Sequence, residues 1–94
     1  MFSIDEHFGR QLRRRRRLVR LTQHQVAAAV GVRFQQIHKY ECGASKLSAA
    51  MLWKLACALD TPVEYFFEGL EQAQTWPSPN DGSRRAVDTS TPSL

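Results

Sequence analysis

The chain has 94 residues, 43% of them hydrophobic, which suffices for one small domain with its own core and no metal or disulfide support. No apolar run approaches the roughly 20 residues of a membrane span, and the N-terminus lacks the order of a secretion signal, so we expect a cytoplasmic protein with reduced cysteines. The net charge of +4 is uneven, with +7 on residues 1–47 and −3 on residues 48–94, as in proteins that turn one surface to a polyanion.

Helix-start signals recur along the chain and predict five helices, over about residues 5–19, 22–30, 33–41, 48–59 and 62–69. Three segments match the capping box, in which side chains satisfy the free N–H groups of a first helical turn. They are Ser3 with Glu6, Thr22 with Gln25, and Thr61 with Glu64. Gly31 falls where the second helix ends. No segment alternates like a strand, so the predicted fold class is all-α.

The first predicted helix contains the run of five arginines at residues 13–17. At about 100° per residue, its apolar stripe consists of Phe8, Leu12 and Val19. Three arginines point away from this stripe, namely Arg13, Arg14 and Arg17. Arg15 and Arg16 flank the stripe, and a lone buried charge is costly, so we expect one of them to pair inward. Helical geometry alone leaves open which one does so.

The segment over residues 22–43 consists of two predicted helices joined by a link of two residues. Gly31 suits a turn that needs a positive φ angle. With Ile37 at the centre of the buried side of the second of these helices, Gln35 and Lys39 point outward, one turn apart. An outer face of amides and a cation is suited to contacts with base edges in the major groove of DNA.

The last two predicted helices supply more of the core and a candidate contact surface. Leu52, Leu55, Ala56 and Leu59 follow helical spacing, and we expect Cys57 to fill space beside them. The segment "VEYFFEGL" holds more large apolar side chains than one helix face can bury. Val63 and Phe66 are expected inward, and for Phe67 both the core and a partner surface stay open. Tyr65, Phe67 and Leu70 are the candidates for a homodimer contact. Residues 70–94 are rich in Pro, Ser and Thr and are predicted to be a flexible tail.

Four blocks of the chain resemble the lambda-repressor-like helix-turn-helix family, also called Cro/C1 or XRE. These blocks are "LRRRR", "TQHQVA", "IHKYECG" and "LWKLACALDTPVEYFF". The resemblance implies a five-helix DNA-binding domain over residues 8–69, with the helix-turn-helix at residues 23–42.

The resemblance also implies roles for individual residues. Five would contact bases, namely Arg33, Phe34, Gln35, Gln36 and Lys39. Four would contact phosphates, namely Gln23, Ser45, Lys46 and Arg13. The resemblance selects Arg16 as the arginine that pairs with Glu41 and fixes the first helix against the third. Two interpretations of Phe34 stay open: contact with a thymine methyl group, or a staple against the core.

These observations predict a transcriptional regulator that binds double-stranded DNA as a dimer and represses by occupying a two-fold operator in the nucleoid. An antitoxin with a toxin partner is the alternative. An RNA binder is a third hypothesis, but the arginine run lacks the interleaved aromatic residues typical of RNA sites. The chain has no nucleophile–base pair, glycine-rich phosphate loop or metal-ligand spacing, so we expect no catalytic residue, no metal and no cofactor.

Overall fold

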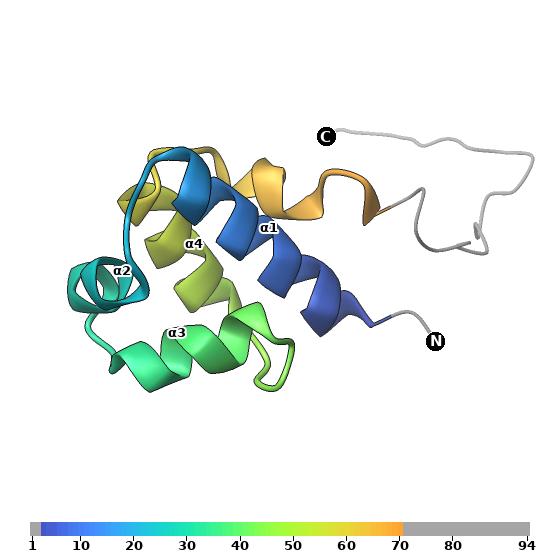
Figure 1. Ribbon diagram of the computed structural model, residues 1–94. Coiled ribbons are helices and arrows are strands. Elements are labelled where there is room, and N and C mark those ends of the chain that lie inside the picture. The colour runs from blue at the N-terminus through green and yellow to red at the C-terminus, as the bar shows by residue number, and fades with distance from the viewer. Residues whose placement is uncertain (1–2, 71–94) are drawn as a thin grey trace, which may run out of the picture.

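The computed structural model describes residues 3–70, and that part of the chain is entirely helical (Figure 1). The elements are α1 (Ile4–Leu18), α2 (Gln23–Val30), α3 (Phe34–Glu41), α4 (Ala49–Ala58) and a short 3-10 helix, η1 (Val63–Phe67). The predicted all-α class is confirmed. Apart from Leu70, the predicted tail lies outside the described residues.

Local capping interactions explain where the helices begin. The Ser3 hydroxyl accepts a hydrogen bond from the backbone N–H of Glu6, at 3.3 Å, and so caps α1. At α2 both halves of the capping box form: Thr22 Oγ1 accepts from the Gln25 N–H at 3.0 Å, and Gln25 Oε1 accepts from the Thr22 N–H at 2.8 Å. Because these partners are only three residues apart, the sequence alone specifies the starts of α1 and α2.

The fifth element differs from the prediction of an α-helix over residues 62–69. It is a 3-10 helix of five residues, and no side chain caps its start, so the predicted capping box of Thr61 and Glu64 does not form. The Gln11 side chain on α1 donates a hydrogen bond of 2.8 Å to the Tyr65 carbonyl. The same carbonyl also accepts the backbone N–H of Glu68 at 3.2 Å, a 3-10 hydrogen bond, and Gly69 follows with a φ of +84°.

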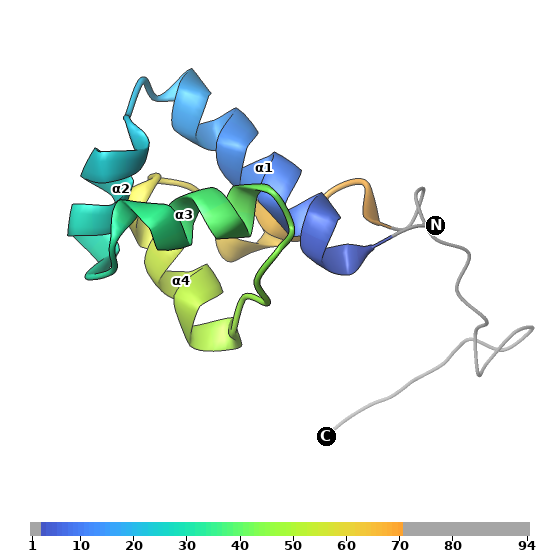
Figure 2. The ribbon, with the colours of Figure 1, turned by 60° about the horizontal axis from the view of Figure 1, so that its bottom comes forward.

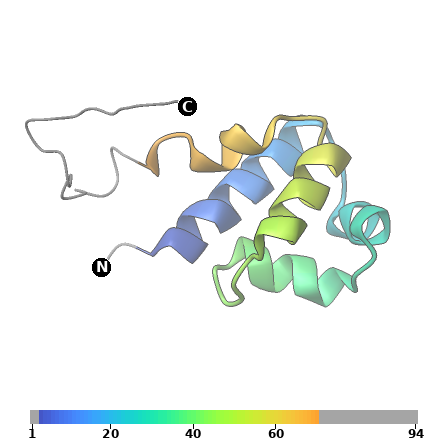
Figure 3. The same cartoon turned by 180° about the vertical axis from the view of Figure 1, so that it is seen from behind.

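The core lies where α1, α2, α3 and α4 meet, with η1 covering one end (Figures 1 and 3). Its fully buried large side chains come from every element: Phe66, Leu12, Ile37, Leu55, Leu59 and Val26. The stripe predicted on α1 is confirmed, because Phe8 and Leu12 are buried and Val19 packs against the cluster. Cys57 is exposed, so the prediction that it fills core space was wrong; on α4 it falls outside the buried stripe.

Two features fix α1 to its neighbours. At Gly9 a Cβ atom would lie 2.4 Å from the Tyr40 carbonyl oxygen, so this position lets the backbones of α1 and α3 approach closely. Arg15 donates hydrogen bonds of 2.9 Å and 2.8 Å to the carbonyls of Leu59 and Asp60, at the end of α4. Cations at a helix C-terminus satisfy carbonyl groups that have no partner within the helix. None of the described helices is long and apolar enough to cross a membrane.

Candidate nucleic-acid interface

Helix α3 lies across the outside of the molecule, and no other described element covers its outer face (Figure 2). Ile37 is fully buried and Tyr40 is 9% exposed, whereas Gln35, His38 and Lys39 are exposed. The helix is thus amphipathic, with its apolar side against the core and its amide and cationic side chains toward solvent. The orientation predicted from helical spacing is confirmed for this helix.

Four of the five predicted base-contacting residues line one shallow hollow of about 360 Å³. They are Arg33, Gln35, Gln36 and Lys39, and Val32 completes the lining. Arg33 occupies the N-cap position of α3 and is exposed; its guanidinium has only donors, so it cannot cap the helix start. The hollow presents two amides and two cations, which are the groups that bind base-edge acceptors and phosphates.

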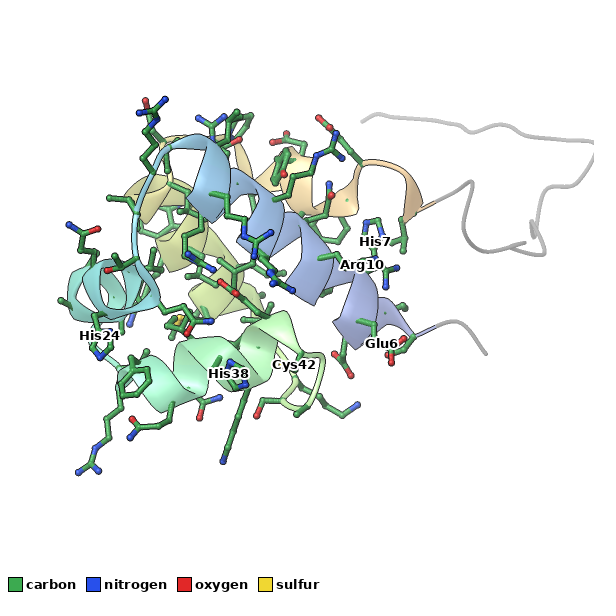
Figure 4. The ribbon with its side chains drawn as sticks, viewed as in Figure 1. Glu6, His7, Arg10, His24, His38 and Cys42 are labelled. Atoms are coloured by element: carbon green, nitrogen blue, oxygen red, sulfur yellow. The ribbon has the colours of Figure 1, made fainter. Side chains whose placement is uncertain are left out.

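Phe34 is the predicted base-contacting residue that does not line this hollow. Its ring stacks on the ring of His24, with centroids 4.0 Å apart and an interplanar angle of 24°. His24 lies in the first turn of α2, and in Figure 4 it stands beside the start of α3. Phe34 is 37% exposed and is absent from the buried core cluster. The observed contact is therefore with a surface ring of α2, and nothing in the sequence pattern signalled this pair.

A buried polar network holds α3 in place. Arg16 meets the Glu41 carboxylate with two hydrogen bonds, of 2.6 Å and 3.1 Å. The same guanidinium donates to the Leu21 carbonyl at 3.0 Å, and Gln23 Nε2 donates to Glu41 at 3.0 Å. The side chains of Arg16 and Glu41 are 13% and 4% exposed. The network joins α1, the link after it, α2 and the C-terminal end of α3.

The expected ion pair of Arg16 and Glu41 thus forms, and Arg15 has inward partners as well. Sequence reasoning expected one inward arginine and missed the second, because Arg15 binds backbone carbonyls and a carbonyl leaves no signal in the pattern of residue types. The three arginines predicted to point outward are exposed: Arg13, Arg14 and Arg17. Together with Arg10 they line a second, wider hollow of about 920 Å³ between α1 and η1.

The predicted phosphate-contacting residues come from three parts of the fold. Arg13 is exposed on α1, Ser45 is half-buried, and Lys46 is exposed in the link between α3 and α4. Gln23 starts α2, and its amide already donates one hydrogen bond to Glu41. An amide nitrogen carries two protons, so Gln23 retains one donor for a phosphate.

The candidate dimer residues lie on and after η1. Phe67 is 45% exposed, and its ring meets the Phe8 ring edge-to-face at 5.2 Å. Tyr65 and Leu70 are half-buried, and burial raises the pKa of the Tyr65 phenol above its ordinary value. Phe66 beside them is fully buried. The segment thus divides its aromatic side chains between the core and the surface.

Comparison with known proteins places the chain among helix-turn-helix proteins. The helix-turn-helix family matches residues 12–66. A transcriptional regulator in the ATPase CF(0) region of Rhodospirillum rubrum is 45% identical over 69 residues, which are 73% of this chain and 64% of that protein. An HTH-type transcriptional regulator of Sinorhizobium fredii, y4aM, is 38% identical over 68 residues, 72% of this chain and 48% of that protein. The chain therefore matches about half to two thirds of the length of these relatives.

Two solved structures share the fold. The restriction-modification controller protein C.AhdI from Aeromonas hydrophila superposes with a TM-score of 0.67 at 29% identity, over 70% of this chain and all of that one. A helix-turn-helix-family transcriptional regulator from Vibrio cholerae gives a TM-score of 0.67 at 28% identity, over 73% of this chain and 39% of that one. The two relatives and the Vibrio cholerae protein are named as transcriptional regulators, the class that the sequence predicted. The chain belongs to the helix-turn-helix family of lambda-repressor-like, XRE-type transcriptional regulators.

Proposed function

We propose that this protein binds double-stranded DNA with α3 as the recognition helix and regulates transcription from the site that it occupies. The observation that carries the proposal is the outward face of α3, where Arg33, Gln35, Gln36 and Lys39 surround one hollow. In helix-turn-helix proteins the N-terminal residues of the recognition helix meet base edges in the major groove. Glutamine amides pair with adenine, and lysine or arginine pairs with guanine acceptors.

The buried network makes this face suitable for sequence recognition. Base contacts need side chains that hold their place on entering the groove, and a loosely held helix would lose entropy on binding. Glu41 receives donors from Arg16 and Gln23, so α3 is fixed at its C-terminal end to α1 and α2. The phosphate contacts proposed for Gln23, Ser45, Lys46 and Arg13 would set the register of α3 on the duplex.

We further propose that the protein acts as a homodimer through Tyr65, Phe67 and Leu70. An isologous dimer places two copies of α3 about one turn of DNA apart, roughly 34 Å, and matches a two-fold operator. Repression by occupying a promoter is the simplest outcome for a domain of this kind, and it places the protein on the nucleoid. The antitoxin alternative adds a toxin partner, which no observation on residues 3–70 supports.

The test of DNA recognition begins with selection of duplexes from a random library by the wild-type protein. Binding of the selected duplex is then measured by fluorescence anisotropy for the double variant Gln35→Ala with Lys39→Ala. Each good base contact contributes about 1–3 kcal/mol, so we expect affinity to fall at least tenfold. Lys54→Ala, which removes an exposed lysine of α4, is the matched control. Equal affinity of the double variant and wild type would refute the assignment of α3.

The dimer proposal is tested by sedimentation equilibrium. Phe67→Ser removes an exposed aromatic side chain from the proposed interface, and Leu18→Ser removes a side chain that is 69% exposed on α1. We expect only Phe67→Ser to weaken the dimer, by tenfold or more, because central aromatic residues dominate interface energies. A wild-type protein that is monomeric on its selected DNA would contradict the proposal, as would a dimer weakened equally by both changes.

A further inference from the structure

The stacked rings of His24 and Phe34 lie on the surface that the proposed function assigns to DNA. They come from neighbouring ends of α2 and α3, and their centroids are 4.0 Å apart at 24°. Figure 4 shows His24 beside the start of α3, on the side of the molecule where α3 is exposed. Both residues are exposed, so the pair is an aromatic patch at the N-terminal end of the recognition helix.

The packing of α2 against α3 does not depend on this pair. The two helices are joined through buried Val26, Val30 and Ile37, and the turn between them is made by Gly31 with a φ of +80°. Gln23 adds a polar link from α2 to Glu41. The surface stack is therefore additional to a turn that is already specified by core packing and backbone conformation.

The stack limits what Phe34 can do. A phenylalanine at the first position of a helix would otherwise sample several side-chain conformations in solvent. The imidazole of His24 lies nearly parallel to the Phe34 ring and stacks on one of its faces, and Phe34 as a whole is 37% exposed. The pair therefore presents a fixed apolar surface next to the amides of Gln35 and Gln36.

The major groove offers one apolar feature for such a surface, the C5-methyl group of thymine. We propose that Phe34 contacts a thymine methyl group in each half-site and that His24 is the positioning residue that holds the Phe34 ring in place. This inference rests on the proposed DNA-binding function and adds a base preference to it. It favours one of the two interpretations of Phe34 that the sequence left open.

The experiment uses the duplex selected by the full-length wild-type protein. Each thymine of a half-site is replaced in turn by deoxyuridine, which keeps base pairing and lacks only the methyl group. Affinities are measured by fluorescence anisotropy for wild type, Phe34→Ala, His24→Ala and His24→Phe. Thermal denaturation followed by circular dichroism checks that each variant is folded.

For wild type we expect one thymine position per half-site at which loss of the methyl weakens binding about fourfold, as for one buried methyl-sized group. Phe34→Ala should abolish this preference, and His24→Ala should reduce it to less than twofold. His24→Phe should restore it, because a benzene ring can stack on Phe34 as the imidazole does. The phenyl ring of His24→Phe cannot donate a hydrogen bond to a phosphate. If this variant restores the preference, His24 acts by positioning Phe34 and not by contacting a phosphate.

Three results would overturn the inference while leaving the proposed function intact. The first is a bound duplex with no methyl-sensitive thymine. The second is a folded His24→Ala protein that keeps the full fourfold preference. The third is a His24→Phe protein that loses affinity equally for thymine and deoxyuridine duplexes, which would make His24 a phosphate contact. Failure of the wild-type protein to select any duplex would instead refute the proposed function itself.

Discussion

Replacing Glu41 by glutamine is expected to destabilise the domain strongly, although the side chain changes little in size. Glu41→Gln removes the negative charge that accepts two hydrogen bonds from Arg16 and one from Gln23. The Arg16 side chain is only 13% exposed, so its charge would lose its partner in a largely buried place. Breaking a buried ion pair by removing one partner costs about 3–5 kcal/mol.

The lower end of that range applies here, for two reasons. Arg16 keeps its hydrogen bond to the Leu21 carbonyl, and a glutamine oxygen still accepts one bond. We therefore expect a loss of about 3 kcal/mol in the free energy of unfolding. A domain of this size has roughly 4–10 kcal/mol in total, so the variant would lose about 30% or more of its stability. The corresponding fall in Tm is about 12 °C or more.

The measurement is urea denaturation monitored by far-UV circular dichroism. A shift of the urea midpoint with an unchanged m-value reports a change in stability. Glu64→Gln, at an exposed acid of η1, is the matched control and should change stability by less than about 0.5 kcal/mol. A second arm compares Arg16→Met, Glu41→Leu and the double variant. The double variant should lose less than the sum of the single losses, because neither charge is left alone.

Two outcomes would refute this reasoning. One is a loss for Glu41→Gln of less than about 1 kcal/mol, which would mean that the network is too hydrated to matter. The other is strict additivity of the Arg16→Met and Glu41→Leu losses, since a direct pair must show coupling. Either result would also weaken the view that α3 is presented to DNA on a rigid support.

Three further changes test other parts of the structure. Gly9→Ala places a Cβ 2.4 Å from the Tyr40 carbonyl oxygen and should lower the free energy of unfolding, measured by urea denaturation, by about 1–3 kcal/mol. A loss below about 0.5 kcal/mol would contradict the close approach of α1 and α3. Arg15→Ala removes two hydrogen bonds to the end of α4 and should lower the free energy of unfolding by about 1–2 kcal/mol in the same assay. An unchanged urea midpoint would show that water replaces these hydrogen bonds. Lys46→Ala should lower the slope of log K against log salt by about 1 in a DNA titration, and an unchanged slope would remove Lys46 from the phosphate contacts.

The sequence by itself determined the features that depend on near neighbours in the chain. The capping bonds of Ser3 and Thr22 span three residues, and the turn at Gly31 depends on one backbone angle. Amphipathic spacing placed Ile37 inward and Lys39 outward, because helical periodicity converts sequence positions into faces. The local segments were therefore predictable from the order of residue types.

Only the tertiary structure decided which groups meet across the fold. Arg15 donates to carbonyls at the end of α4, and Gln11 donates to the Tyr65 carbonyl of η1. At η1 the sequence predicted an α-helix and a 3-10 helix formed. The His24 ring, in the first turn of α2, stacks on the Phe34 ring at the start of α3. Backbone carbonyls and surface rings carry no periodic signal, so such partnerships depend on how the helices pack and not on the spacing of residues along any one of them.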